Sequence, residues 1–69
     1  MINWQLLALK IRKYKSYSLI EKEIGVSAEH LRKLSRNEQQ EPRFSSGIKL
    51  LDLAHDLMPA HEFNEFRID

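Results

Sequence analysis

The stretch that decides the fold runs from residue 19 to residue 36 and reads LIEKEIGVSAEHLRKLSR. Apolar residues at helical spacing predict a short amphipathic helix that covers about residues 17–24. Gly25 ends it, because glycine adopts the left-handed conformation that closes a helix without a Cβ clash. A turn of three or four residues that contains glycine, placed between two short helices, is typical of a helix-turn-helix.

A second helix, rich in basic residues, is predicted over residues 28–36. Ser27 comes directly before it and is a good N-cap, because its hydroxyl can accept a hydrogen bond from a free backbone N–H. Leu31 and Leu34 lie on one side of this helix and are expected to anchor it on the first. Its other side projects outward and carries Ala28, Glu29, Arg32, Lys33 and Arg36.

Ahead of this stretch, a helix is predicted over residues 4–15. Asn3 is its expected N-cap. Apolar residues recur at i, i+3, i+4, i+7 and i+10, which is the pattern of one buried helix face. This apolar stripe consists of Trp4, Leu7, Ala8, Ile11 and Tyr14.

Behind the central stretch, residues 37–46 are mostly polar and are expected to form a loop, because Pro42 biases the residue before it away from helix. A further helix is predicted over residues 47–57, with Ser45 or Ser46 as its cap. Pro59 can open a last short helical turn. The tail that follows is either helical or a short strand, and the pattern leaves both open.

The expected class is therefore all-α: one domain over residues 1–69, with four to five helices that include the helix-turn-helix and a short C-terminal strand as the alternative for the tail. The 69 residues contain no cysteine and only two glycines, which excludes thiolate chemistry, a phosphate loop and a dinucleotide fingerprint. His30, His55 and His61 lack the spacing of a metal site. We expect no enzyme, cofactor, metal or small-molecule substrate.

Charge is distributed unevenly along the chain. Residues 1–36 contain eight basic and three acidic residues, whereas residues 37–69 contain three basic and seven acidic residues. A basic half of this kind can face a polyanion. Charges interrupt every apolar stretch and no signal peptide is recognisable, so we expect no membrane span and a cytoplasmic location.

The chain resembles the helix-turn-helix regulators of the Cro and phage-repressor class. The resemblance rests on Ile24-Gly25-Val26-Ser27 followed by Leu31, on Pro42, and on the later pattern Leu50-x-x-Leu53-Ala54-x-x-Leu57. It departs at Glu21, where the class usually has a small residue, so either this side chain runs outward or the crossing of the two helices is altered. It departs also at Tyr17, where the class often has Gln, and in a loop that is a few residues longer than usual.

The resemblance implies a repressor that binds double-stranded DNA and reads the major groove with residues 28–36. Arg32 is expected to contact guanine and Glu29 cytosine, while Lys33 reaches guanine or phosphate. Ser27 and Ala28 allow close approach to the groove edge. Phosphate contacts are expected from Tyr17, Arg36, Arg43 and the basic end of the first helix.

Small regulators of this class usually act as dimers. We therefore expect a homodimer whose interface includes Phe63, Phe66 or Ile68, with packing of these residues inside one chain as the alternative. A second alternative concerns function: the chain is then a helical protein-binding module, similar to an antitoxin or inhibitor, that does not bind DNA. Glu21 and the acidic second half favour that alternative.

Overall fold

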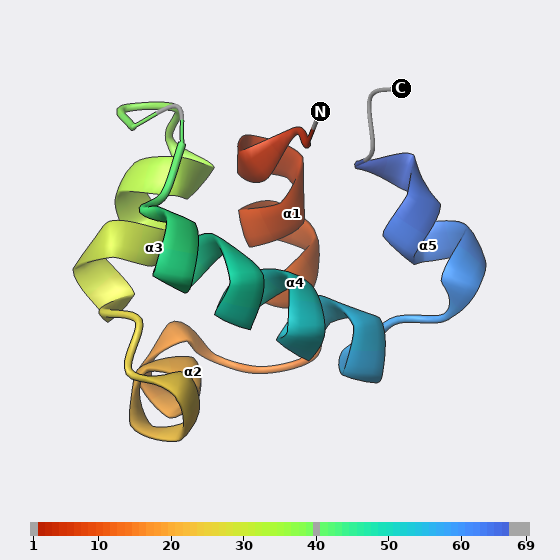
Figure 1. Cartoon of the computed structure of the whole chain (residues 1–69), viewed down its shortest axis with the longest axis horizontal. Helices are drawn as coiled ribbons and strands as arrows, with labels where there is room; N and C mark the ends of the chain where they lie inside the picture. The colour runs from red at the N-terminus through yellow and green to blue at the C-terminus, as the bar shows by residue number, and fades with distance from the viewer. Residues whose placement is uncertain (1, 40, 67–69) are drawn as a thin grey trace.

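The computed structural model describes residues 2–39 and 41–66, and these residues form five helices (Figure 1). This confirms the all-α class. The helices are α1 (Trp4–Ile11), α2 (Tyr17–Ile24), α3 (Ala28–Ser35), α4 (Phe44–Leu57) and α5 (Ala60–Glu65). The sequence leaves the tail open between helix and a short strand over residues 66–68: residues 63–65 belong to α5, and residues 67–69 lie outside the described residues.

The helix-turn-helix forms as its local sequence predicts. Gly25 has a φ of 76°, in the left-handed region, and its N–H donates to the Glu21 carbonyl at 2.9 Å. Val26 is buried in the corner between α2 and α3. The Ser27 hydroxyl accepts from the His30 N–H at 3.0 Å and so caps α3. The position and direction of α3 therefore follow from residues within a few positions of the turn.

The core lies between α1 and the helices that pack around it. The apolar stripe of α1 is buried at Leu7, Ala8 and Ile11, and it packs against α3 and α4. Leu31 and Leu34 bury the underside of α3, as their spacing predicts. The core is completed by residues from the other elements: Tyr17, Ile20, Val26, Ala28, Leu50, Leu53, Ala54, Met58 and Phe66.

The first helix is shorter than predicted, because it ends at Ile11 and not at Lys15. The residues after it form a turn in which the Tyr14 N–H donates to the Ile11 carbonyl at 3.1 Å. Ser16 then caps α2 by accepting from the Leu19 N–H. Because the chain changes direction before residue 14, the Tyr14 side chain leaves the apolar stripe and is 41% exposed.

The fourth helix begins earlier than predicted, at Phe44, and the predicted loop is correspondingly shorter. Arg43 takes the N-cap position without a side-chain hydrogen bond, and its carbonyl accepts from the Gly47 N–H at 2.8 Å. A Cβ on Gly47 would lie 3.2 Å from the Trp4 ring, so glycine permits this helix to approach α1 closely. Tertiary packing therefore sets this helix start, in place of the predicted serine caps.

The predicted dimer contact through Phe66 is wrong, because this side chain is fully buried within one chain. Its carbonyl accepts from the Asn3 N–H at 2.7 Å, and its ring meets that of Phe63 edge-on at 5.0 Å between centroids. Phe63 is itself partly buried against the core. Ile68 lies outside the described residues. Phe66 therefore packs within one chain, which is the alternative that the sequence analysis gives to a dimer contact.

Candidate nucleic-acid interface

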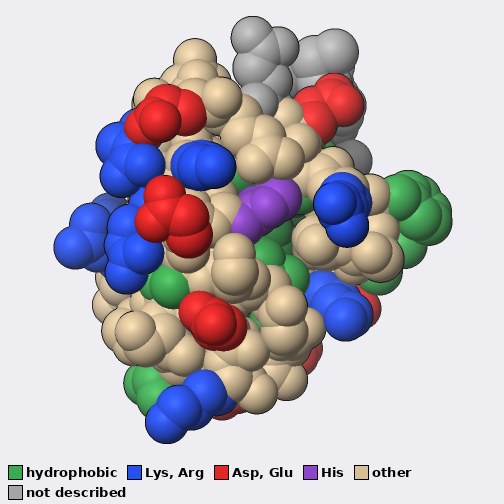
Figure 2. Space-filling view, turned by 90° about the vertical axis from the view of Figure 1, so that its left-hand side faces the viewer, with side chains coloured by type: hydrophobic (Ala, Val, Ile, Leu, Met, Phe, Trp, Pro, Cys, Tyr) green, Lys and Arg blue, Asp and Glu red, His purple; other side chains and the backbone are tan. Residues whose placement is uncertain are grey.

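The outward side of α3 carries the charged residues that the sequence assigned to it. Glu29, Arg32, Lys33 and Arg36 are all exposed. Figure 2 views the molecule from the side where α3 lies in Figure 1, and it shows Lys and Arg side chains clustered toward one edge with acidic side chains between them. The face is therefore mixed in charge and not uniformly basic.

Glu29 accounts for part of this mixing. Its carboxylate lies 3.3 Å from the Arg32 guanidinium and 3.7 Å from that of Arg36. Arg36 also forms an ion pair with Glu38, and this hydrogen bond raises the pKa of Arg36 above its usual value. Exposed ion pairs of this kind are weak and screened by salt. Another anion can therefore replace the carboxylates as the partner of these two arginines.

The N-terminal end of α3 is closed by two hydrogen bonds. Besides the Ser27 cap, the Ala28 N–H donates to the Glu21 carboxylate at 2.8 Å. The side chain of Glu21 thus runs outward along the turn, which is one of the two arrangements expected for this residue. A carboxylate at a helix N-terminus is favourable because the helix dipole is positive there. The same carboxylate adds negative charge at the end of α3 that the resemblance places in the groove.

Ala28 and Tyr17 differ from their predicted roles. Ala28 is buried, so its side chain packs inward and only its backbone lies near the surface. Tyr17 is also buried, and its hydroxyl donates to the Ala8 carbonyl at 2.7 Å. That carbonyl lies in the last turn of α1, where helix carbonyls lack intrahelical partners. The predicted phosphate contact through the Tyr17 side chain is therefore wrong, because its hydroxyl, the one polar atom of this side chain, is used inside the fold.

Tyr17 lies instead at the edge of a basic hollow. The hollow has a volume of about 360 Å³ and lies between the start of α2 and the outer side of α3. Arg12 belongs to the basic end of the first helix, and its guanidinium lies 5.7 Å from the centre of the Tyr17 ring. The described residues that line the hollow include no acid: Arg12, Ser16, Tyr17, Ser18, Arg32, Ser35 and Arg36.

The hollow has the composition of an oxyanion site. Guanidinium groups donate several hydrogen bonds in a planar arrangement that matches phosphate. The first N–H groups of α2 also lack intrahelical partners and carry partial positive charge. From the sequence, only the basic end of the first helix is predicted to contribute to this site. The pair of serines that flanks Tyr17 at a helix start was the signal for this part of the hollow.

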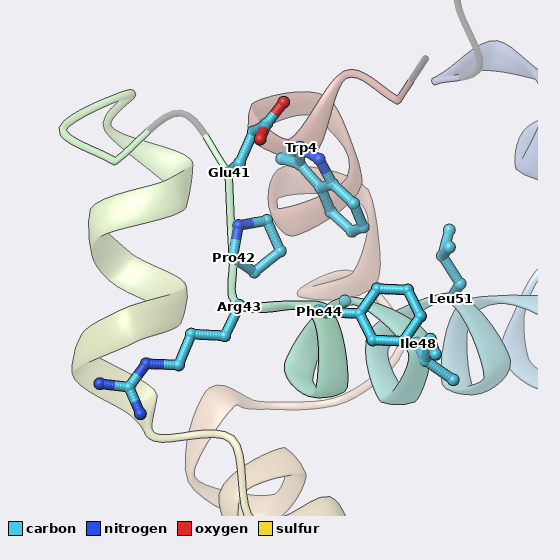
Figure 3. A pocket seen from close by; sticks show the side chains of 8 residues that line it. Trp4, Glu41, Pro42, Arg43, Phe44, Ile48 and Leu51 are labelled. Carbon is cyan, nitrogen blue, oxygen red and sulfur yellow. The ribbon is translucent and has the colours of Figure 1, made fainter.

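A second basic flank lies on the side of α3 that faces the loop. The pKa of His30 is lowered, first by burial of the ring and then by the positive charges of Arg43 and Lys33. Both cations therefore lie close to this histidine. Figure 3 shows the Arg43 side chain extending from its loop toward α3. Among the described residues, neither Lys33 nor Arg43 forms an ion pair.

The acidic second half of the chain does not form a separate negative surface throughout. Glu65 of α5 pairs with Lys10 of α1, which lowers the pKa of Glu65, and Glu62 accepts a hydrogen bond from the Tyr14 hydroxyl. Part of the predicted charge asymmetry is therefore neutralised where α5 meets α1. The cations of the hollow and of the loop flank lie elsewhere, around α3.

Within residues 2–39 and 41–66, no group of three or more His, Asp or Glu side chains is placed to hold a metal ion. No helix in these residues is long and apolar enough to cross a membrane. Comparisons with protein-family models, curated proteins and solved structures find no match for this chain.

Proposed function

We propose that this protein is a sequence-specific DNA-binding regulator, a Cro-like repressor that reads the major groove with α3. The observation that carries the proposal is the basic hollow, because it adjoins the outer side of α3 and draws its arginines from two separate elements. A helix that reads bases needs neighbouring groups that hold the phosphate backbone and fix its register. The hollow supplies such groups on one flank of α3.

The residues divide into two roles. Arg32 and Glu29 project from the outer side of α3 and are the proposed base-reading residues. Arg12 and Arg36 in the hollow, with Arg43 on the opposite flank, are the proposed phosphate contacts. Lys33 lies near His30 and is proposed to contact either guanine or phosphate. Repression by occlusion of a promoter is the simplest mechanism for a domain of this size.

Selection of bound sequences from a random pool of double-stranded DNA tests the proposal. We expect an enriched motif, and then measure affinity for that motif and for a scrambled duplex by fluorescence anisotropy. Arg32→Ala should weaken binding to the motif by about 1–3 kcal/mol and change binding to the scrambled duplex much less. Arg36→Ala is the matched control, because loss of a phosphate contact weakens both duplexes equally.

Equal loss on both duplexes with Arg32→Ala makes this residue a phosphate contact and refutes its base-reading role. Failure to enrich any motif, with binding that persists at low salt, refutes sequence specificity.

The second candidate is a helical protein-binding module that does not bind DNA. The carboxylate of Glu21 at the N-terminal end of α3 favours it, since negative charge at this end opposes approach to DNA. Glu29 and Glu38, which form ion pairs with Arg32 and Arg36, act in the same direction. Absence of salt-sensitive DNA binding at micromolar protein would favour this candidate over the first.

A further inference from the structure

The basic hollow contains serine hydroxyls as well as guanidinium groups, and one of these hydroxyls is not used by the fold. Ser16, Ser18 and Ser35 all line the hollow. The Ser16 hydroxyl caps α2, and the Ser35 hydroxyl donates to the Arg32 carbonyl at 2.7 Å. Ser18 is exposed, and its hydroxyl forms no hydrogen bond with the described residues 2–39 and 41–66. Its oxygen is therefore available to react.

A negative group attached to Ser18 would meet positive charge from two sources. Ser18 is the second residue of α2, and the first turn of this helix contains no acidic residue. The N–H groups of a first turn lack intrahelical partners and carry partial positive charge. The second source is the set of guanidinium groups that line the same hollow: Arg12, Arg32 and Arg36.

The segment ahead of Ser18 has the charge of a protein kinase substrate. Residues 12–15 read RKYK, so three of these four residues are basic. Kinases select substrates partly by charge pattern, and a run of basic residues suits a kinase with an acidic cleft. The segment lies between α1 and α2, outside both helices. Because helix ends fray, this segment and the first turn of α2 can extend into such a cleft.

We propose that Ser18 is a phosphorylation site that switches DNA binding off by placing the chain's own phosphate in the basic hollow. This inference rests on the proposed function, which assigns the hollow to a phosphate of DNA. In the reaction, the Ser18 Oγ attacks the γ-phosphorus of a nucleoside triphosphate held by a protein kinase. The new O–P bond forms as the bond to the nucleoside diphosphate breaks, and the hydroxyl proton passes to the base of the kinase.

The expected loss of DNA affinity follows from the cations that the phosphate engages. A phosphoserine carries a charge of about −1.5 to −2 near neutral pH and three acceptor oxygens, and it pairs well with clustered arginines. Arg12 and Arg36 are two of the proposed contacts to DNA phosphate. Each such contact contributes about 0.9 to the slope of log affinity against log salt. Loss of both should reduce that slope by about 1.8 and lower affinity about 60-fold at about 0.1 M salt.

The first measurement needs no DNA. Chemical synthesis can supply the full chain phosphorylated at Ser18, and phosphorus NMR can follow the second ionisation of the phosphate against pH. The chain phosphorylated at Ser45 is the matched control. Ser45 is also exposed, is also the second residue of its helix, α4, and also has no acid in the first turn, but it does not line the hollow. The Ser18 phosphate should ionise at a lower pH than the Ser45 phosphate, because the arginines stabilise its dianion.

Two substitutions identify the cations that cause this difference. Arg12→Gln in the chain phosphorylated at Ser18 should move the ionisation toward that of the Ser45 control. Lys13→Gln removes a neighbouring charge that lies near Glu65, so it should leave the ionisation unchanged. Circular dichroism should show unchanged helix content and no loss of thermal stability on phosphorylation at Ser18, because negative charge is favourable in the first turn of a helix.

The second measurement is fluorescence anisotropy with the enriched DNA motif. Phosphorylation at Ser18 should produce the loss of about 60-fold, and phosphorylation at Ser45 a much smaller one. A third measurement tests the reaction itself. The unmodified chain, incubated with MgATP and a purified serine kinase that selects basic substrates, should gain phosphate at Ser18 and not at Ser45, as located by mass spectrometry.

Three results would overturn the inference. Equal ionisation of the Ser18 and Ser45 phosphates would show that the phosphate does not enter the hollow. Equal loss of DNA affinity in the two phosphorylated chains would show that added charge alone opposes DNA. Phosphate placed by the kinase only on other residues, or on none, would refute Ser18 as the modified residue. An unmodified chain that binds no DNA would instead refute the proposed function, while a lowered ionisation that Arg12→Gln reverses would still establish the phosphate site.

Discussion

Replacing Arg12 by Gln tests whether the basic hollow binds a DNA phosphate. Arg12 lines the hollow beside α2, whereas its neighbour Lys13 lies near Glu65 of α5. Both residues are exposed cations in the same turn. Lys13→Gln is therefore a matched control that removes the same charge, one position along the chain, from a different surface.

The expected magnitude follows from the cations that surround α3. Arg12 and Arg36 lie in the hollow, and Lys33 and Arg43 lie on the opposite flank. If each of these neutralises one phosphate, log affinity falls with log salt at a slope of about −3.6, because each phosphate releases about 0.9 counterion. Affinity should then fall about 150-fold between about 50 and 200 mM salt.

Arg12→Gln should remove one of these contacts. The slope should change to about −2.7, and affinity at about 0.1 M salt should fall about eightfold. Lys13→Gln should keep the slope of the unmodified chain. Fluorescence anisotropy with a labelled duplex, over a series of salt concentrations, measures both quantities.

The loss should be the same for specific and scrambled DNA, because phosphate contacts do not depend on sequence. Equal slopes for Arg12→Gln and Lys13→Gln would refute the assignment of the hollow to phosphate. A slope near zero for the unmodified chain would refute the whole electrostatic argument.

Two further predictions concern stability. Tyr17→Phe leaves the Ala8 carbonyl without its buried donor and should lower the free energy of unfolding by about 1–2 kcal/mol in urea denaturation; a change below about 0.5 kcal/mol contradicts this role. The pKa of His30 is lower in the folded chain than its ordinary value of 6.5, so the folded state resists protonation of this ring. The stability that His30 contributes is therefore present above pH 6.5 and is lost as the pH falls below that value. His30→Gln should therefore flatten the decline of unfolding free energy below that pH, and an unchanged decline would show that burial, Arg43 and Lys33 do not act on this ring as described.

The sequence by itself determined the features that depend on neighbours along the chain. A helix N-cap involves residues three positions apart, and Asn3 and Ser27 cap α1 and α3 as predicted. The left-handed turn needs only a residue without a Cβ, which Gly25 supplies. The buried side of α3 follows from the spacing of Leu31 and Leu34. Each of these follows from local geometry, so the helix-turn-helix and the outward charges of α3 were predictable.

The tertiary structure decided where long side chains point and where helices end. Tyr17 turns inward because an unpaired carbonyl of α1 lies within reach, and Glu21 reaches the first N–H of α3 across the turn. Phe66 enters the core instead of a dimer contact, since α5 packs on α4. The start of α4 follows from the approach of Trp4 to Gly47. These outcomes depend on atoms brought together from distant positions, and no short-range pattern records such distances.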